Sequence, residues 1–487
     1  MFVLYRKIAA LVCVTCLLVG FADDVHSQDR YMEIAARYSS ASIFHNALVL
    51  PDGDAFQTVI TFRIPNSLLI FKQERNGFAA DVDVTVELLQ NGVKVADQIW
   101  HEQHRTSSFA ATQSRTEDVY GWVQFHAEPG AYAYRLVVDG TAIDDRDAFG
   151  SFAVGEYADS NVGPLMFGYL QSDSQRISFE PIALGGSVPF GVDVPAVVPV
   201  FGKEFDVAFD PADGAVIDPA DDVMLTYRLY HVAQSGNAVM TRREARRNRR
   251  EVLEASTAVV ESIEIGQGDD LVASGTVAAD ALVPIGEFLG SDVGCLCWLP
   301  AADENTHLAV IQLSSDRLEN GTYVLNVSLP GEGRSHKYRF STQWRDMPLS
   351  LYDVEVAIRN LEYIEDRGTV RKLLEGSDEG RVEAFNAYWL ERDPTPETVY
   401  NELMHEYYRR IDHAAFQFRT GQHPFPDGLR TDAARIYIVY GPPDDISSSL
   451  PASGGVEQTW TYTDGRQFTF WAASSLAPLE LQEGALP

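Results

Sequence analysis

The chain has 487 residues and a formal net charge of −32, from 38 basic and 70 acidic side chains. This length exceeds what one hydrophobic core normally supports, so we expect about three domains. Hydrophobic residues make up 45% of the chain, as in folded globular proteins, and the acidic balance, which repels phosphate backbones, argues against binding to nucleic acid.

Residues 1–27 have the pattern of a secretory signal peptide. Basic residues precede an apolar run over residues 8–21, and Ser27 supplies a small residue before a cleavage site at Gln28. The apolar run is short for a membrane span. We therefore expect an exported protein, periplasmic or extracellular, with at most peripheral contact with the membrane.

The cysteines leave two questions open. Cys16 raises the alternative of a lipoprotein, but the residues before it lack the small side chains of a lipobox, so a cleaved signal is favoured. Cys295 and Cys297 have C-x-C spacing without a second pair to complete a four-ligand zinc site, so we expect no metal and no other cofactor. Two small buried thiols are the favoured interpretation of this pair, and a local disulfide is the second.

A lead-in segment over residues 28–44 is followed by a predicted β-sandwich over residues 45–157. Asn91-Gly92 is a strong hairpin signal within it. Strict alternation puts five apolar residues on one strand face: Ala80, Val82, Val84, Val86 and Leu88. Short strands at this spacing are typical of an antiparallel sandwich.

A second sandwich is predicted over residues 170–345, in tandem with the first. Pro129-Gly130-Ala131-Tyr132 before one strand is echoed by Asn320-Gly321-Thr322-Tyr323 before another, which suggests a similar plan in both halves. The second sandwich contains a basic run over residues 241–250. Such a run can dock an anionic partner, but in so acidic a chain we favour pairing with the protein's own carboxylates or a solvated helical insertion.

The period becomes helical after about residue 348, and we predict an α+β domain over residues 350–476, followed by a tail over 477–487. A helix over residues 396–418 would be capped by Thr395, with Leu403 among its apolar residues. Residues 435–440 are apolar on both faces and are predicted to form a central strand. The fold class is therefore multidomain, with two tandem antiparallel β-sandwich modules and a C-terminal α+β domain.

Chemical motifs in this domain favour structural roles. His405-Glu406 lacks the second histidine four residues on that a zinc protease motif requires. Asp432 and Asp444 flank the predicted strand at opposite ends, too far apart for a paired acid and base. We expect Asp432 to clasp a turn, by bonding backbone N–H groups and by pairing with an arginine, either Arg409, Arg410 or Arg435.

Several segments in this third of the chain resemble the GWxTD domain family of secreted bacterial proteins of unassigned function. They are Tyr388-Trp389-Leu390-Glu391-Arg392-Asp393-Pro394-Thr395-Pro396, Glu406-Tyr407-Tyr408-Arg409-Arg410, Thr431-Asp432 and Arg435-Ile436-Tyr437-Ile438-Val439-Tyr440-Gly441-Pro442-Pro443-Asp444. Leu429 stands where the family has tryptophan. The resemblance implies export and a β-rich companion region, and names no reaction.

We favour a non-enzymatic protein of the cell envelope that binds a partner, a protein or another envelope component, or organises an assembly; its oligomeric state is left open. The alternative is a hydrolase-like enzyme with a site at the ends of the predicted strand over 435–440. The candidate binding or structural-motif residues are Arg409, Arg410, Thr431, Asp432, Arg435, Tyr440 and Asp444.

Overall fold

The computed structural model describes Tyr31, Ile34 and residues 42–484, except for 53–54, 142–146, 156–160, 202–222, 233–269, 279–280, 291–294, 302–305, 331–334, 419–427, 453 and 475–476. The predicted signal peptide and the basic run over 241–250 lie outside the described residues. Within the described residues, no helix has the length and apolar character that crossing a membrane requires.

Two antiparallel sheets form the first β-rich unit. One has the order β1–β2–β6, and the other has the order β3–β4–β7–β8 with β5 also paired to β4. The strands are β1 (Phe44–Asp52), β2 (Ala55–Pro65), β3 (Lys72–Glu74), β4 (Gly77–Gln90), β5 (Val93–Thr106), β6 (Asp118–His126), β7 (Gly130–Asp139) and β8 (Asp147–Val154). A 3-10 turn, η1 (Asn66–Leu68), and the short helix α2 (Phe109–Thr112) lie between strands. The predicted alternating residues of β4 are buried between the sheets, and Asn91 and Gly92 form the expected turn with φ of 51° and 76°.

The second β-rich unit packs a closed set of six strands on a five-stranded sheet. The closed set runs β10–β16–β15–β17–β12–β9, and the sheet runs β11–β19–β18–β13–β14. Its strands are β9 (Met166–Ser172), β10 (Ile177–Pro181), β11 (Val188–Pro189), β12 (Val194–Phe201), β13 (Val223–His231), β14 (Asp270–Ala278), β15 (Leu282–Phe288), β16 (Leu296–Pro300), β17 (Thr306–Leu313), β18 (Thr322–Ser328) and β19 (His336–Gln343), with η4 (Ser315–Arg317) before β18. Cys295 and Cys297 form a disulfide at the start of β16, so the second alternative for this pair holds.

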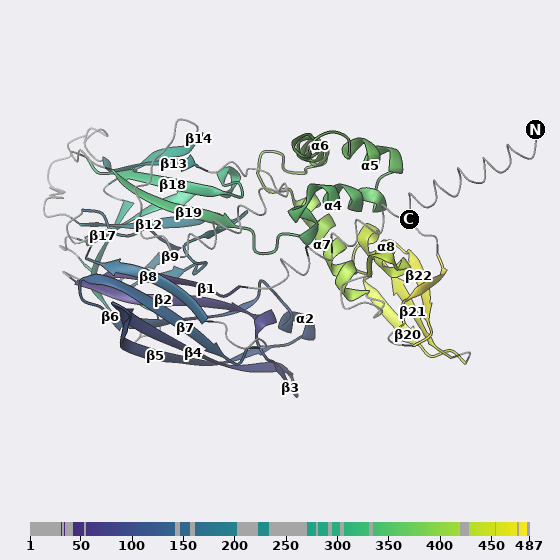
Figure 1. Ribbon diagram of the computed structural model, residues 1–487, viewed down its shortest axis with the longest axis horizontal. Helices are drawn as coiled ribbons and strands as arrows, with labels where there is room; N and C mark the ends of the chain where they lie inside the picture. The colour runs from purple at the N-terminus through teal and green to yellow at the C-terminus, as the bar shows by residue number, and fades with distance from the viewer. Residues whose placement is uncertain are drawn as a thin grey trace, which may run out of the picture.

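The sheet β1–β2–β6 is an internal layer shared by both units. On β2, Ile60 packs in the core of the first unit, whereas its neighbour Val59 packs with Trp298 of the second, and all three side chains are fully buried. The Trp298 indole also donates to the carbonyl of Pro51 at 2.7 Å. Because both faces of one sheet are covered, the two units form one continuous stack of layers (Figure 1).

The sequence echo corresponds to the same local contact in both units. The Tyr132 hydroxyl donates to the carbonyl of Glu128 at 3.0 Å, and the Tyr323 hydroxyl donates to the carbonyl of Glu319 at 2.9 Å. Each bond returns four residues along the chain, as in the tyrosine corner of β-sandwiches. Both β-rich units therefore contain the same corner, although their strand arrangements differ.

Helices and a four-stranded sheet form the C-terminal domain, on the far side of the molecule from most of the sandwich strands (Figure 1). The helical elements are η5 (Leu349–Tyr352), α4 (Val354–Arg359), η6 (Asn360–Tyr363), α5 (Arg367–Leu373), α6 (Asp378–Leu390), α7 (Glu402–Gln417), η7 (Gly428–Arg430) and α8 (Asp432–Tyr440). The sheet contains β20 (Asp445–Ser449), β21 (Val456–Thr461), β22 (Gln467–Ala472) and β23 (Glu480–Glu483) in that order. The fold class is thus as predicted.

The predicted central strand over residues 435–440 is wrong, because these residues belong to helix α8. Thr431 caps the helix, and its buried residues recur at helical spacing: Ala433, Ala434, Ile436, Tyr437 and Ile438. A run of β-branched and aromatic residues favours a strand locally. Here the packing on α7 and the cap at Thr431 stabilise a helix instead. Gly441, with φ of 83°, ends the helix rather than a strand.

Helix α7 begins later than predicted. Asn401 caps it by accepting a bond from the Met404 N–H at 2.8 Å, so Thr395 is not the cap. Met404 is buried at 5% exposure, whereas Leu403 is 47% exposed. The prediction that Leu403 belongs to the core is therefore wrong, because the buried face of α7 contains Met404, Tyr407, Tyr408 and Ile411, and Leu403 lies beside that face.

Candidate functional site

The segment that resembles the family pentapeptide, Gly428 to Asp432, builds the start of helix α8. A Cβ atom at Gly428 would collide with the carbonyl oxygen of Ala414, so glycine allows η7 to lie directly against the end of α7. Leu429 is buried in the domain core, and its carbonyl accepts a bond from the Tyr363 hydroxyl at 3.0 Å. Leucine thus fills an apolar core position where the family has tryptophan.

Thr431 and Asp432 fix the first turn of α8. The Thr431 hydroxyl donates to the carbonyl of Gly428 at 2.9 Å and accepts from the N–H of Ala434 at 3.2 Å. Asp432 accepts a bond from the N–H of Leu481 in β23, at 2.9 Å from Oδ2. The helix start is therefore capped and also tied to the edge of the sheet, as the clasp hypothesis expects.

The two candidate arginines on α7 bond a different carboxylate from the one predicted. Arg409 and Arg410 each donate from Nε to Glu406 at 2.7 Å. Burial alone would raise the pKa of Glu406, but the bonds from both arginines outweigh it and lower that pKa. Arg410 also lies 3.4 Å from the carbonyl of Val439, so its charge faces the C-terminus of α8, where a cation is favourable.

The remaining candidates lie along α8 and just beyond it. The Arg435 guanidinium lies 5.8 Å from the centre of the Tyr363 ring. Tyr440 stacks on Phe468 at 5.4 Å, and Asp444 accepts a bond from the Thr463 hydroxyl at 3.0 Å at the end of the β20–β21 pair. The contact of Tyr440 with Phe468 of β22 thus joins the end of α8 to the sheet.

The structure gathers the candidates around the two ends of α8. Thr431, Asp432 and Arg435 lie at its start, and Arg410, Tyr440 and Asp444 lie at its end. A nine-residue helix is about 13 Å long, which separates Asp432 from Asp444 beyond the reach of an acid–base pair. The hydrolase alternative placed its site at the ends of a strand over 435–440, and the structure has helix α8 there instead.

Sequence reasoning missed a buried contact between the chain's N-terminal segment and α7. The Tyr31 hydroxyl donates to Asp412 Oδ1 at 2.8 Å, and the Leu349 N–H donates to Oδ2, also at 2.8 Å. Tyr31 is 2% exposed, and burial raises the pKa of Asp412 to about 6. The lead-in segment thus contributes a core residue to the C-terminal domain.

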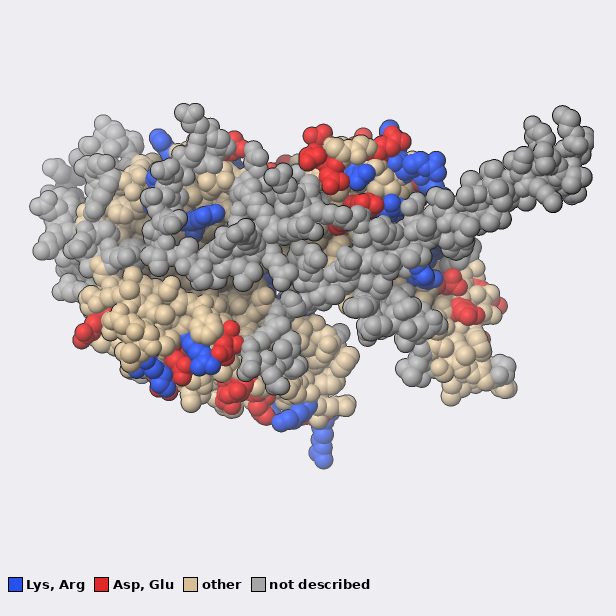
Figure 2. Space-filling model, in the orientation of Figure 1, with Lys and Arg blue, Asp and Glu red and all other residues tan. Residues whose placement is uncertain are grey.

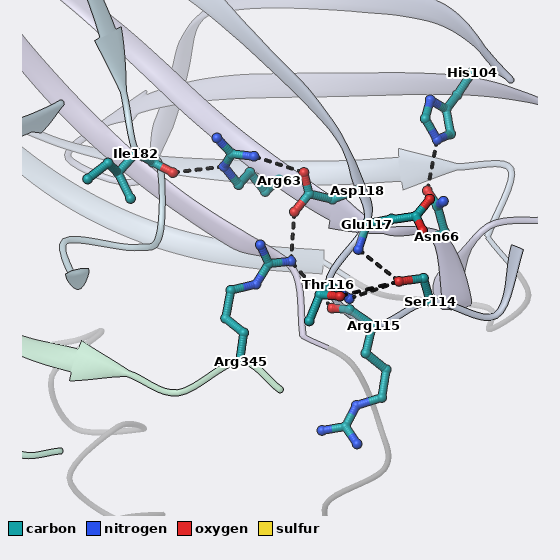
Figure 3. Close-up of polar contacts among 10 residues, drawn as sticks. All are labelled: Arg63, Asn66, His104, Ser114, Arg115, Thr116, Glu117, Asp118, Ile182 and Arg345. Atoms are coloured by element: carbon teal, nitrogen blue, oxygen red, sulfur yellow. Dashed lines mark hydrogen bonds and ion pairs between the residues drawn. The ribbon is translucent and has the colours of Figure 1, made fainter. Parts of the chain in front are cut away.

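A second missed site connects the sandwich stack to the C-terminal domain through Asp118 (Figure 3). Asp118 accepts from Arg63 on β2 at 2.9 Å and from Arg345 after β19 at 2.7 Å. The Arg63 Nε also donates to the carbonyl of Ile182 at 2.7 Å. With its side chain 6% exposed, Asp118 joins the first unit, the second unit and the segment that leads into the C-terminal domain.

His405 lies beside a carboxylate and two aromatic rings. Its Nε2 lies 3.0 Å from Asp346, and its ring packs beside Trp344 and Tyr400 where the second sandwich meets α7. Across the described ranges, no cluster of three or more His, Cys, Asp or Glu side chains has the arrangement that a metal ion needs. The arrangement at α8 anchors a helix and a sheet: Arg409 and Arg410 pair with Glu406 on α7, and Asp432 bonds the Leu481 N–H of β23.

Known proteins give a family for part of the chain. No curated protein matches the sequence. Among solved structures, a crystal structure of an ICAM-5 ectodomain fragment, D1 to D4, is similar over 62% of this chain and 54% of that one, at 11% identity and a TM-score of 0.12. This chain thus spans about half the length of that fragment, and at so low a TM-score we draw no conclusion from the likeness. Residues 321–476, from β18 to the end of the β22 hairpin, match the GWxTD domain family, so the C-terminal third of this chain is a GWxTD domain.

Proposed function

We propose that this chain is an exported protein of the cell envelope that acts as a binding or assembly module. The observation that carries the proposal is the use made of the GWxTD residues. Gly428, Leu429, Thr431 and Asp432 serve respectively close packing, the core, a helix cap and an anchor to β23. Because these groups form contacts within the domain, we assign them to holding a scaffold together rather than to a reaction.

The connection between the parts also supports a scaffold. The sandwich units share a buried sheet, and Asp118 with Arg345 ties them to the start of the GWxTD domain. Tyr31 adds a contact from the N-terminal segment to α7. A protein whose modules are connected at several buried points presents its surfaces in a fixed arrangement, which suits an assembly role.

Crosslinking in the native cell envelope, followed by mass spectrometry of the captured proteins, tests the binding role. We expect one or a few specific envelope components whose capture is lost when the GWxTD domain is unfolded by Ile438→Ala. Capture that is the same with the unfolded variant would contradict the proposal. A substrate turned over by the purified chain would favour an enzyme instead.

A mass measurement of the exported protein tests the proposed cleavage of the signal peptide. The mass of the protein recovered from the envelope or medium should correspond to a chain that begins at Gln28, since residues 1–27 have the pattern of a cleaved signal. A lipid-modified N-terminus at Cys16, or retention of the full chain inside the cell, would contradict this part of the proposal.

A further inference from the structure

Strand β20 is an exposed edge with little charged protection, because only its first residue, Asp445, carries a charge. It pairs with β21 on one side only, and all five of its residues are exposed. After Asp445, the chain has no charged side chain over residues 446–456. An unprotected edge strand offers every second N–H and C=O to another strand.

The edges of β5 and β23 show the usual protection. β5 carries Lys94, Asp97, Glu102 and Arg105, and β23 carries Glu480 and Glu483. Figure 2 shows red and blue atoms along the lower border of the sandwich stack, whereas the lower end of the C-terminal domain, where Figure 1 places β20 and β21, is tan. In a chain with a net charge of −32, this edge is a place where another acidic molecule can approach without strong repulsion.

Two exposed apolar side chains lie beside this edge. Ile446 is 50% exposed and Leu450 is 82% exposed. Ile446 stands opposite Trp460, which is buried at 2%, so it extends the apolar face of the sheet beyond the part that the helices cover. Leu450 directly follows Ser449, the last residue of β20, and extending the strand by one residue would place it on the same face as Ile446 and Ser448. The edge therefore combines backbone N–H and C=O groups on the side of β20 away from β21 with apolar side chains that are exposed to water.

We propose that two copies of this chain pair in antiparallel orientation through their β20 strands, with the twofold axis at Ser448. This register places Ser448 opposite its symmetry mate and Ser447 opposite Ser449. It also places Ile446 opposite Leu450 of the other copy, twice, so that each exposed apolar residue covers another. The strand is complementary to itself, which is what a closed twofold interface requires.

This pairing deepens the proposed assembly function and rests on it for its biological role. Five residues of strand bury less surface than the roughly 800 Å² per partner of a standard interface, so the dimer depends on concentration. Salt should strengthen it, because screening reduces the repulsion between two copies that each carry −32.

Sedimentation of the purified chain from Gln28 onward, over about 1 to 500 µM at low and high salt, tests the pairing. We expect a monomer–dimer equilibrium that shifts toward dimer with salt. Leu450→Glu should raise the dissociation constant of the dimer at least tenfold, because it places a carboxylate opposite Ile446. Leu390→Glu is the matched control, since Leu390 is 59% exposed on α6 and the change in net charge is the same. A monomeric parent at every concentration, or equal dimerisation of both variants, would overturn the proposal.

A cysteine at the twofold axis tests the register. Ser448→Cys should form a disulfide-linked dimer on mild oxidation, because residues at the centre of an antiparallel pair have Cα atoms within disulfide range. A dimerising chain in which Ser448→Cys does not crosslink would overturn this interface. Capture of an envelope protein by a monomeric parent would overturn self-pairing while leaving the proposed binding function intact.

Discussion

The sandwich stack and the GWxTD domain use buried polar residues differently. In the first sandwich, the buried polar residues of β2 are Thr58 and Thr61, which lie in regular strand positions. In the GWxTD domain, Asp353, Asn401 and Thr431 cap α4, α7 and α8 respectively. The strand positions of the stack follow from a repeated alternation, whereas in the helical domain single capping side chains set where each helix begins.

The largest expected effect tests whether the core of the GWxTD domain includes α8. Ile438 is 1% exposed in this helix, so Ile438→Ala should lower the free energy of unfolding by about 2 to 5 kcal/mol through lost burial and an unfilled cavity. Leu403→Ala on α7 is the matched control, and its cost should stay below about 1 kcal/mol because the side chain is half exposed. Thermal or urea unfolding of both variants measures the difference; equal melts would show that the packing of α8 is wrong.

The second prediction tests the connection between the two regions. Asp118→Ala leaves the Arg63 and Arg345 guanidinium groups without their shared carboxylate, and should cost about 2 to 3 kcal/mol because the site is mostly enclosed. Limited proteolysis should also cut the segment after β19 faster. Asp464→Ala removes an exposed pair with Arg466 and should leave stability nearly unchanged, because exposed ion pairs are screened by water and salt. If both variants behave alike, Asp118 does not join the regions.

The comparison also explains which parts of the fold the sequence could predict. Strands such as β4 follow from period-two alternation, and the tight turn at Asn91-Gly92 follows from local backbone preference. Residues 435–440 have the composition of a strand, and tertiary packing on α7 overrides it. Signals for the helix were present, however: Thr431 before an acidic residue is a typical cap, and Gly441 follows the last turn.

The candidate site was predicted in part. A structural clasp at Asp432 was anticipated, but its partner, the Leu481 N–H, lies in an edge strand 49 residues away that no local pattern indicates. Arg409 and Arg410 were, with Arg435, alternatives for pairing with Asp432, but both pair with Glu406 on their own helix at helical spacing. The contact between Tyr31 and Asp412 spans 381 residues and depends on tertiary structure alone. Contacts of such separation have no signature in a single sequence.

The third prediction concerns pH and the Asp412 carboxyl. Its pKa is raised to about 6 in the folded chain by burial, so the folded state keeps a proton that the unfolded chain releases near pH 4. Its contribution to stability is therefore full below about pH 4 and is lost as pH rises through about 6, with a total of about 1 to 3 kcal/mol.

Asp412→Asn should remove this contribution. Tyr31, Arg115 and His405 act on the carboxyl and stay in place in the variant, so the difference between the two stability profiles isolates Asp412. Urea unfolding from pH 4 to 7 gives both profiles. Parallel profiles, with no divergence between pH 4 and 6, would show that this carboxyl does not titrate as its surroundings predict.

The smallest expected effects belong to the residues for which the family is named. Thr431→Ala removes the cap of α8 and should cost about 1 kcal/mol. Asp432→Ala loses the bond from Leu481 and a favourable charge at the helix start, again about 1 kcal/mol, whereas Asp432→Asn keeps an acceptor and should cost less. Chemical unfolding resolves these differences when the variants are measured side by side.

Partner capture decides whether Asp432 has more than this structural role. If Asp432 is a clasp, each variant should weaken capture only in proportion to the fraction of unfolded chain, because the carboxylate bonds a backbone group within the domain. Thr431→Ala serves as the control, since it destabilises the same turn without changing a charge. If Asp432→Asn melts like the parent and yet abolishes capture while Thr431→Ala does not, the carboxylate itself contacts the partner, and the start of α8 is a binding site rather than a scaffold.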